Sequence, residues 1–285
     1  LDAFITAGIQ PDHECSTLEE ATEKLEHGQW IMIREGTAAR NLAALAPLLR
    51  SPLRERCMFC SDDKHPNDLL KRGHMDDIAR TAIRCHGVDP IIAVKTASFQ
   101  AAQYFSLKGR GAVAPGYFAD ITVIDSFEQF QPKMVIKDGV IRWREGEVPE
   151  LSAPHIDKQL SARAHDTFHT AHLRAEQFSS SESLGVIGLV PGDIRSTDCG
   201  RANQIDLKRD ILKISVIERH RGTGHIGLGY LHGYGLSRGA VATSVAHDSH
   251  NLIVVGTNDA DMAAAANHVI AQGGGIAVLE QGRLL

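Results

Sequence analysis

A pair of carboxylates directly follows an apolar run near residue 60. The stretch over residues 57–66 reads CMFCSDDKHP, and its apolar part, Cys57–Cys60, ends just before Asp62 and Asp63. Burying even a neutral polar group without a partner costs roughly 2–7 kcal/mol, so a strand that delivers two acids is poorly suited to stability alone. Such a pair is typical of a place where a metal, a proton or a substrate meets the protein. The alternative is that Asp62 or Asp63 caps a helix that has Pro66 in its first turn.

A histidine and a second set of acids follow another short strand. Ile9–Cys15 (IQPDHEC) predicts a strand that ends in Asp12, His13 and Glu14. If the strands are parallel, His13 and Asp62 converge, and an imidazole with a carboxylate suits Zn, Mn or Fe. A catalytic metal needs about three protein ligands, so these two leave the site incomplete. The alternative for His13 is a hydrogen bond to the backbone.

Arg34 ends the strand that lies between these two in sequence. Trp30–Ile33 is an apolar run followed by Arg34 and Glu35 within MIREGTAARN. We expect Arg34 to hold a carboxylate or bind substrate, and an ion pair at the rim is the alternative. Near the other end of the chain, AHDSHN places His247, Asp248 and His250 in a tight connection. This cluster predicts contact with substrate or a metal, or else a turn stabilised by its own side chains.

The five cysteines are not a disulfide framework, because their number is odd and their spacing irregular. Cys57 and Cys60 have CxxC spacing, but in a strand these positions face opposite sides, so we expect both to serve packing. Histidines at 165, 169 and 172 fall at helical spacing, and we expect a solvated connector helix rather than a metal face. The glycine-rich segment Gly222–Gly239 lacks a phosphate-loop pattern and is predicted to be a loop.

Elements that position these residues repeat in the order strand, helix. Residues 1–106 predict three such repeats, which is typical of βαβ units and a parallel sheet, either a small open sheet or the last part of a barrel. Ser16 or Thr17 is expected to cap the first helix, and Ser16 with Glu19 fits a capping box. Further helices are expected over the following ranges: Thr37–Leu49, Gly73–His86 and Pro90–Leu107.

The remainder of the chain predicts three further regions. Residues 107–145 form a β element that includes a hairpin with its turn at Asp138–Gly139. Residues 146–183 are expected to be a linker with a surface helix. Residues 184–285 predict an α/β domain, with strands and a helix over the following ranges: Val186–Val190, Ile211–Ile217, Ala240–Ser244, Leu252–Val255, Asp259–Ala271 and Ile276–Leu279.

Composition restricts the classes of function. Hydrophobic residues make up 43% of the 285 and charged residues 23%, which is typical of a globular protein. The net charge of -5 argues against an obligatory nucleic-acid partner. No apolar run approaches the ~18–20 residues that span a bilayer, so no membrane partner is expected. The odd number of cysteines, their irregular spacing and the lack of a signal peptide predict a reducing cytoplasm.

Several stretches together resemble the bacterial adenine deaminases of the amidohydrolase superfamily. The resemblance lies in DHE at residues 12–14, MIREGTAARNLAALAPL at 32–48, CSDD at 60–63, APGYFADI at 114–121 and VATSVAHDSHNLIVVG at 241–256. It implies an α/β fold: the C-terminal part of a metal-dependent (β/α)₈ barrel, a small β-sandwich element and a C-terminal α/β domain. It also implies that the superfamily's His-x-His, a carboxylate and a further histidine would lie before Leu1, as expected if the chain is part of a longer protein.

The resemblance further implies hydrolysis of adenine to hypoxanthine and ammonia. His13 and Asp62 would be metal ligands, Asp62 the proton shuttle and Glu14 a catalytic acid toward a ring nitrogen. Asp63, Arg34, His247, Asp248 and His250 would contact substrate. The cofactor would be Mn²⁺ or Fe²⁺, with Zn²⁺ as an alternative, binuclear in the intact enzyme, and the assembly a homodimer. Two alternatives remain: another cyclic amidohydrolase, such as a dihydropyrimidinase-like enzyme or a deacetylase, and a catalytically silent scaffold.

Overall fold

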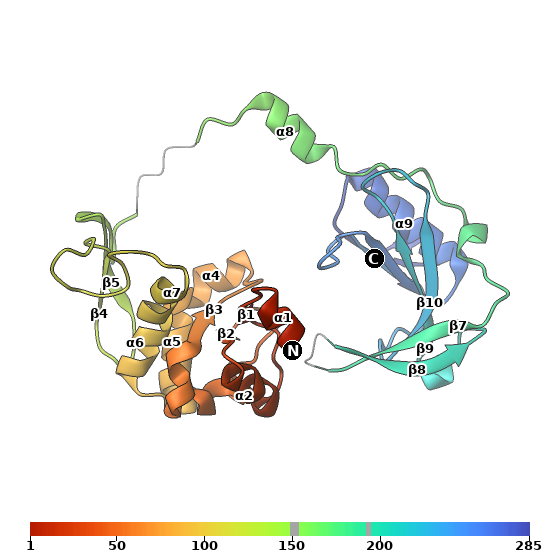
Figure 1. The fold of residues 1–285 in the computed structure, drawn as a ribbon. Coiled ribbons are helices and arrows are strands. Elements are labelled where there is room, and N and C mark those ends of the chain that lie inside the picture. The colour runs from red at the N-terminus through yellow and green to blue at the C-terminus, as the bar shows by residue number, and fades with distance from the viewer. Residues whose placement is uncertain (149–153, 192–194) are drawn as a thin grey trace. The chain divides into compact units, whose positions relative to one another are not determined.

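The chain forms two compact units, which are described separately below. The computed structural model describes residues 1–148, 154–191 and 195–285. Unit 1 comprises Leu1–Ser152 and unit 2 comprises Ala153–Leu285. Figure 1 shows both units with their helices and strands. Within the described ranges, none of the helices combines the length and the apolar character needed to cross a membrane.

Unit 1 is built on a three-stranded parallel sheet in the order β1-β2-β3. The strands are β1 (Pro11–Asp12), β2 (Trp30–Arg34) and β3 (Cys57–Cys60). The parallel sheet and the three strand positions confirm the prediction, although β1 is shorter than Ile9–Cys15. His13 and Glu14 therefore lie just beyond the strand end, in the connection that leads to the first long helix.

Helices follow each strand of unit 1, but three of their predicted details are wrong. Of the two predicted caps of the helix after β1, Thr17 is confirmed, because its Oγ1 accepts the Glu20 N–H at 3.3 Å, and the Ser16–Glu19 capping box is wrong. The helix expected over Thr37–Leu49 starts only after Asn41 and soon tightens into a 3₁₀ turn that contains a proline. The helix expected over Pro90–Leu107 is interrupted at Ser98.

The observed helical segments of unit 1 are α1 (Asp2–Thr6), α2 (Leu18–Glu26), α3 (Leu42–Leu45), η1 (Ala46–Arg50), η2 (Pro52–Arg56), α4 (Pro66–Arg72), α5 (Met75–His86), α6 (Pro90–Ala97) and α7 (Phe99–Tyr104). After the interruption at Ser98, the buried positions of α7 are Gln100 and Ala102, whereas Phe105 is exposed. Gln100 donates its side-chain N–H to the Arg54 carbonyl at 2.7 Å, which fixes α7 against the end of η2.

The core of unit 1 lies between the sheet and its helices. Ile31 and Ile33 of β2 are fully buried and pack with Leu42 and Leu45 of α3 in one apolar cluster. This burial stabilises the strands whose ends carry the polar residues, at roughly 1.5–3 kcal/mol for each large apolar side chain. Trp30, at the start of β2, contacts the Tyr104 ring with 5.4 Å between centroids.

The β element of unit 1 is a three-stranded antiparallel sheet in the order β4-β5-β6. Its strands are β4 (Ile121–Ile124), β5 (Pro132–Lys137) and β6 (Val140–Arg144). Asp138 and Gly139 connect β5 to β6 with φ values of 52° and 77°. The predicted hairpin and its turn at Asp138–Gly139 are thus confirmed.

Unit 2 contains an eight-stranded sheet in the order β14-β13-β11-β12-β9-β10-β7-β8, which is antiparallel except for the β10–β7 pair. Helix α9 (Asp259–Gln272) packs on this sheet, as Figure 1 shows, and buries Met262 and Ala266 against it. The other elements are α8 (Lys158–His165), η3 (Ala175–Phe178), β7 (Leu184–Leu189), β8 (Ser196–Ala202), η4 (Leu207–Arg209), β9 (Ile211–Ile217), β10 (Ile226–His232), β11 (Ala240–Thr243), β12 (Leu252–Gly256), β13 (Ile276–Glu280) and β14 (Arg283–Leu284).

One prediction for unit 2 is wrong, and three of its strands, β8, β10 and β14, were not expected. Gly222–Gly239 is not a continuous loop, because β10 lies inside it and pairs with both β9 and β7. Strands β8 and β14 were missed. The connector helix α8 is confirmed as solvated, since none of its residues is buried, but it ends at His165 and leaves His169 and His172 outside it.

Candidate active site

Four of the predicted site residues meet at the carboxyl edge of the β1-β2-β3 sheet. His13 and Glu14 follow β1, Arg34 ends β2, and Asp62 lies two residues beyond β3. Because the strands are parallel and in register, with Arg34 opposite Cys60, their carboxyl ends open on the same side. This is the edge at which parallel α/β folds place their ligands.

The acidic groups surround the histidine and the arginine. His13 Nε2 lies 3.2 Å from Glu14 Oε1 and 3.9 Å from Asp62 Oδ2. Arg34 donates from Nη1 to Asp62 Oδ2 at 2.5 Å and to Glu14 Oε1 at 2.9 Å, and from Nη2 to Glu14 Oε2 at 3.0 Å. One guanidinium therefore holds two carboxylates that come from different strands.

The charge of Arg34 is retained although the side chain is only 5% exposed. Burial by itself lowers the pKa of Arg34, but hydrogen bonds to Glu14 and Asp62 outweigh this and raise that pKa above its usual value. The three residues are thus coupled electrostatically, and this arrangement favours a positioning role for Arg34.

Asp62 and Asp63 do not cap the next helix, so that alternative is wrong. Helix α4 begins at Pro66, and His65 occupies the position before it without a side-chain cap. Asp62 instead adopts a left-handed backbone with φ of 48°, a conformation that aspartate tolerates better than most residues. This turn directs the Asp62 carboxylate back toward His13 and Arg34.

Asp63 lies against the backbone of Gly36. Its Oδ1 is buried and has no hydrogen-bond partner among the described residues. A Cβ at Gly36 would come within 2.5 Å of that oxygen and 2.9 Å of the Ser61 carbonyl oxygen. Only glycine allows this approach, which explains the glycine in the turn that follows β2.

The donor set at this edge suits a divalent transition metal. One donor atom each from His13, Glu14 and Asp62 lies within 4.8 Å of the other two. An imidazole and two carboxylates are ligands that Mn, Fe and Zn accept. Cys60 is not a comparable donor, because burial, the largest influence, raises the pKa of its thiol to about 12. Arg34 donates hydrogen bonds to the Glu14 and Asp62 carboxylates, so it competes with any cation for these oxygens. Both Glu14 oxygens accept from Arg34, which limits the availability of Glu14 as a metal ligand.

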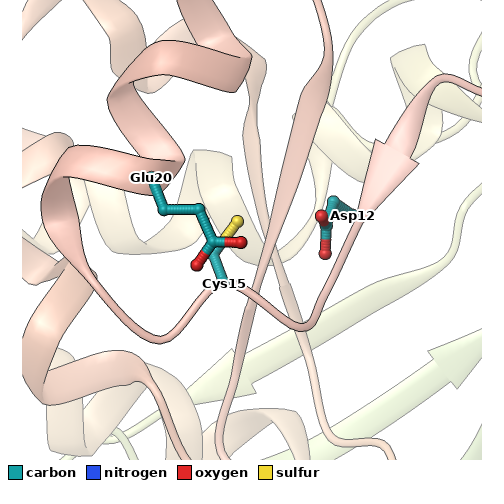
Figure 2. A group of neighbouring side chains, drawn as sticks. All are labelled: Asp12, Cys15 and Glu20. Carbon is teal, nitrogen blue, oxygen red and sulfur yellow. The ribbon is translucent and has the colours of Figure 1, made fainter. Parts of the chain in front are cut away.

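A second acidic group, which sequence reasoning missed, lies on the other side of the same loop. Figure 2 shows Glu20 reaching from α2 toward Cys15, with Asp12 across the connection. Lys24 Nζ lies 2.5 Å from Asp12 Oδ2, 2.7 Å from Glu20 Oε1 and 3.7 Å from Cys15 Sγ. The Glu20–Lys24 spacing of four residues on a helix is the one sequence signal for this ion pair.

The ammonium of Lys24 already satisfies the charges of this group. Burial by itself raises the pKa of Asp12, but the hydrogen bonds from Lys24 and from the Glu14 N–H lower it on balance. Burial, reinforced by Asp12, raises the pKa of the Cys15 thiol to about 11. Because Lys24 lies at the centre and the Cys15 thiol is protonated, this group is a structural ion pair rather than a metal centre.

The residues predicted in AHDSHN lie on an exposed loop of unit 2. His247 Nδ1 pairs with the Asp248 carboxylate, and the His247 and His250 rings are 6.2 Å apart. Arg219 Nε donates to the His250 carbonyl at 2.5 Å, and the His220 ring nitrogen lies 2.8 Å from the Ser249 carbonyl oxygen. The loop is held to its neighbour through its backbone, which leaves the two imidazoles exposed. Their substrate or metal contact stays a prediction.

Comparison with known proteins finds a family match in each of the two units. Residues 3–142 match the sequence model described as the amidohydrolase family, and residues 194–285 match the one described as the adenine deaminase C-terminal domain. Two relatives named adenine deaminase, from Kosmotoga olearia and Desulfatibacillum aliphaticivorans, are 41% and 44% identical, and each covers 100% of this chain. The alignments span 50% and 51% of those relatives, so the chain corresponds to about half their length.

A solved structure adds a distant likeness. The β-aspartyl dipeptidase of Fervidobacterium islandicum AW-1 is 17% identical, with a TM-score of 0.38, over 47% of this chain and 38% of that one. Similarity at this level carries no argument about the site.

Proposed function

We propose that this chain, which belongs to the amidohydrolase family and matches one half of its adenine deaminases, takes part in the hydrolytic deamination of adenine. The reaction takes adenine and water to hypoxanthine and ammonia. The convergence of His13, Glu14 and Asp62 at one strand edge is the observation that carries this proposal, because it places an imidazole and two acids where parallel folds bind ligands. The relatives' name supports adenine as the substrate.

His13 and Asp62 would hold the divalent metal that this family generally requires. Such an ion, when bound, would supply Lewis acidity and lower the pKa of a coordinated water toward neutrality. Asp62 Oδ2 accepts a proton from the attacking water and returns it to the amine that leaves C6. An acid–base group positioned in this way contributes roughly 10²–10⁴-fold to the rate.

Glu14 and Arg34 act together beside that proton transfer. We assign Glu14 to the purine ring, where it protonates or holds a ring nitrogen, because it adjoins His13 and points into the same site. Arg34 fixes Glu14 and Asp62 relative to each other through its three hydrogen bonds. Asp63 orients the purine from the neighbouring turn.

Finer features of the assembly follow as parts of the same proposal. Strands β1 and β3 would be the sixth and eighth of a (β/α)₈ barrel, and the β4-β5-β6 sheet would belong to a β-sandwich. The metal would be Mn²⁺ or Fe²⁺ in a binuclear centre, and the enzyme a cytoplasmic homodimer. These features are inferred from the resemblance to the family.

Ammonia release from adenine, with added Mn²⁺, tests the proposal on the protein at its natural full length. Asp62→Asn keeps the size of the side chain but removes the proton carrier, so we expect kcat to fall by about 10²–10⁴-fold. Asp125→Asn is the matched control, because among the described residues Asp125 accepts N–H groups of the local backbone in the β element. Glu14→Gln is expected to lower kcat/KM while the protein keeps its bound Mn²⁺.

Two results would contradict the assignment. Near-normal kcat/KM in Glu14→Gln would show that Glu14 takes no part in the reaction. No ammonia from adenine by a protein that binds Mn²⁺, together with turnover of a cyclic amide in a substrate panel, would move the activity to another cyclic amidohydrolase.

A further inference from the structure

The side chain of Asn41 joins the segments that carry the site. It lies in the connection between β2 and α3 and is 6% exposed. Its Oδ1 accepts the Arg34 N–H at 2.7 Å, and its Nδ2 donates to the Cys15 carbonyl at 2.9 Å and to the His13 carbonyl at 3.3 Å. Its own N–H donates to the Arg34 carbonyl at 3.0 Å.

These contacts restrain the loop after β1 on both sides of Glu14. The carbonyls of His13 and Cys15 flank Glu14, and both accept from the same amide nitrogen. The backbone of Arg34 is bonded in both directions by Asn41, through its N–H and its carbonyl. One residue thus relates the backbone that carries His13 and Glu14 to the backbone that carries Arg34.

Only a side-chain amide of this length satisfies the position. An amide offers an acceptor oxygen together with two N–H donors, whereas a carboxylate offers only acceptors. Aspartate at this position would keep the bond from the Arg34 N–H and place a negative oxygen against two carbonyl oxygens. Leaving buried carbonyls without donors costs roughly 1–3 kcal/mol for each group.

We propose that Asn41 is a positioning residue for the metal-binding edge. It fixes His13 and Glu14 relative to Arg34, and through Arg34 relative to Asp62, without contact to substrate. The inference rests on the proposed metal site, but not on adenine as the substrate. Neighbours that orient metal ligands typically change metal affinity by about 10–100-fold when mutated.

The test measures Mn²⁺ affinity by titration of the metal-free protein at its natural full length. We expect Asn41→Asp to weaken Mn²⁺ binding by about 10–100-fold and to lower kcat for adenine by a similar factor, with a smaller change in KM. Asn41→Ala, which removes the amide without adding charge, is expected to weaken Mn²⁺ binding by at least about tenfold.

Asn267→Ala is the matched control. Asn267 makes the same kind of bridge within unit 2, because its side chain accepts the Leu173 N–H and donates to the Leu173 carbonyl, both at 2.8 Å. It should lower the thermal stability while Mn²⁺ affinity and kcat stay at the wild-type level.

Three outcomes decide the inference. Wild-type Mn²⁺ affinity in both Asn41 variants would overturn it, as would an equal loss of affinity in Asn267→Ala, since that would indicate general destabilisation. If the wild-type protein binds Mn²⁺ but releases no ammonia from adenine, the proposed function fails, while weakened Mn²⁺ binding in the Asn41 variants would still support the inference.

Discussion

Arg34 brings a permanent positive charge to a place that water scarcely reaches. Two carboxylates compensate it, and the backbone beneath it is held by Asn41. A buried guanidinium of this kind restricts the geometry of its partners, because any movement of Glu14 or Asp62 exposes an unpaired charge. At the residue scale, the site therefore depends on a small set of directional bonds rather than on a deep apolar pocket.

Stability at alkaline pH depends on a buried thiol of β3. Burial raises the pKa of Cys57 to about 12 from an ordinary 9.0. A raised folded pKa means that stability is complete below about pH 9 and falls as pH rises toward 12, by up to about 1.4 kcal/mol per pH unit. We expect Cys57→Ala to reduce this alkaline loss, measured as the free energy of urea unfolding at about pH 8 and about pH 10.5.

Cys85→Ala is the control for this prediction, because Cys85 is exposed on α5. It should leave the difference between the two pH values unchanged. The Cys57→Ala protein would still lose some stability at high pH, since the thiols of Cys15 and Cys60 also have raised pKa values. An alkaline loss equal to that of the wild type would contradict the role given to Cys57.

The turn after β2 sets the separation between two strand ends. Gly36→Ala would place a Cβ 2.5 Å from Asp63 Oδ1 and 3.1 Å from the Ala39 carbonyl oxygen, so the turn must move. Overpacking of this kind costs typically 1–3 kcal/mol. We expect a corresponding fall in the urea midpoint together with a reduced kcat, measured on the same preparation.

Gly185→Ala in β7 serves as the comparison for this element. A Cβ at Gly185 would meet nothing within 4 Å, and its φ is not positive. Its urea midpoint should stay close to that of the wild type. Equal midpoints for the two variants would show that the turn accommodates a methyl group.

At the scale of elements, apolar runs and turn chemistry were readable from the sequence. Strands β2, β3 and β12 were predicted because each is built on a continuous apolar segment. Strand β10 was missed because glycines alternate along it. Strand β8 was missed because six of its seven residues are exposed, and a polar strand at the edge of a sheet has no apolar pattern that would identify it. Both strands are defined by their neighbours, through pairing that no local pattern encodes.

The site shows the same division between local and long-range information. His13, Glu14, Arg34 and Asp62 were identified because each follows a recognisable strand, and a parallel sheet brings strand ends together. Asn41 and Lys24 were missed because their function depends on carbonyls and carboxylates that are distant in sequence. The helix break at Ser98 was likewise missed, because no proline or glycine lies between residues 91 and 107 to mark it.

At the scale of the whole molecule, each unit has its own apolar core. In unit 2, the exposed imidazoles of the loop around His247 are predicted to contact substrate or a metal. We expect His247→Ala to lower kcat/KM for adenine by about tenfold or more, as loss of a substrate or metal contact does. The measurement is ammonia release from adenine by the protein at its natural full length.

His268→Ala in α9 is the control for that prediction, because it removes an imidazole elsewhere in the same unit. Activity and Mn²⁺ content equal to those of the wild type in His247→Ala would withdraw the assignment.

The contact between Trp30 and Tyr104 has a practical consequence for separating the behaviour of the two units. The chain has two tryptophans, at positions 30 and 143, and both belong to unit 1. Tryptophan emission is therefore a built-in optical probe of unit 1, while the circular dichroism of the backbone reports on both units. A variant that shifts the unfolding transition followed by circular dichroism, but not the one followed by tryptophan emission, is destabilised in unit 2.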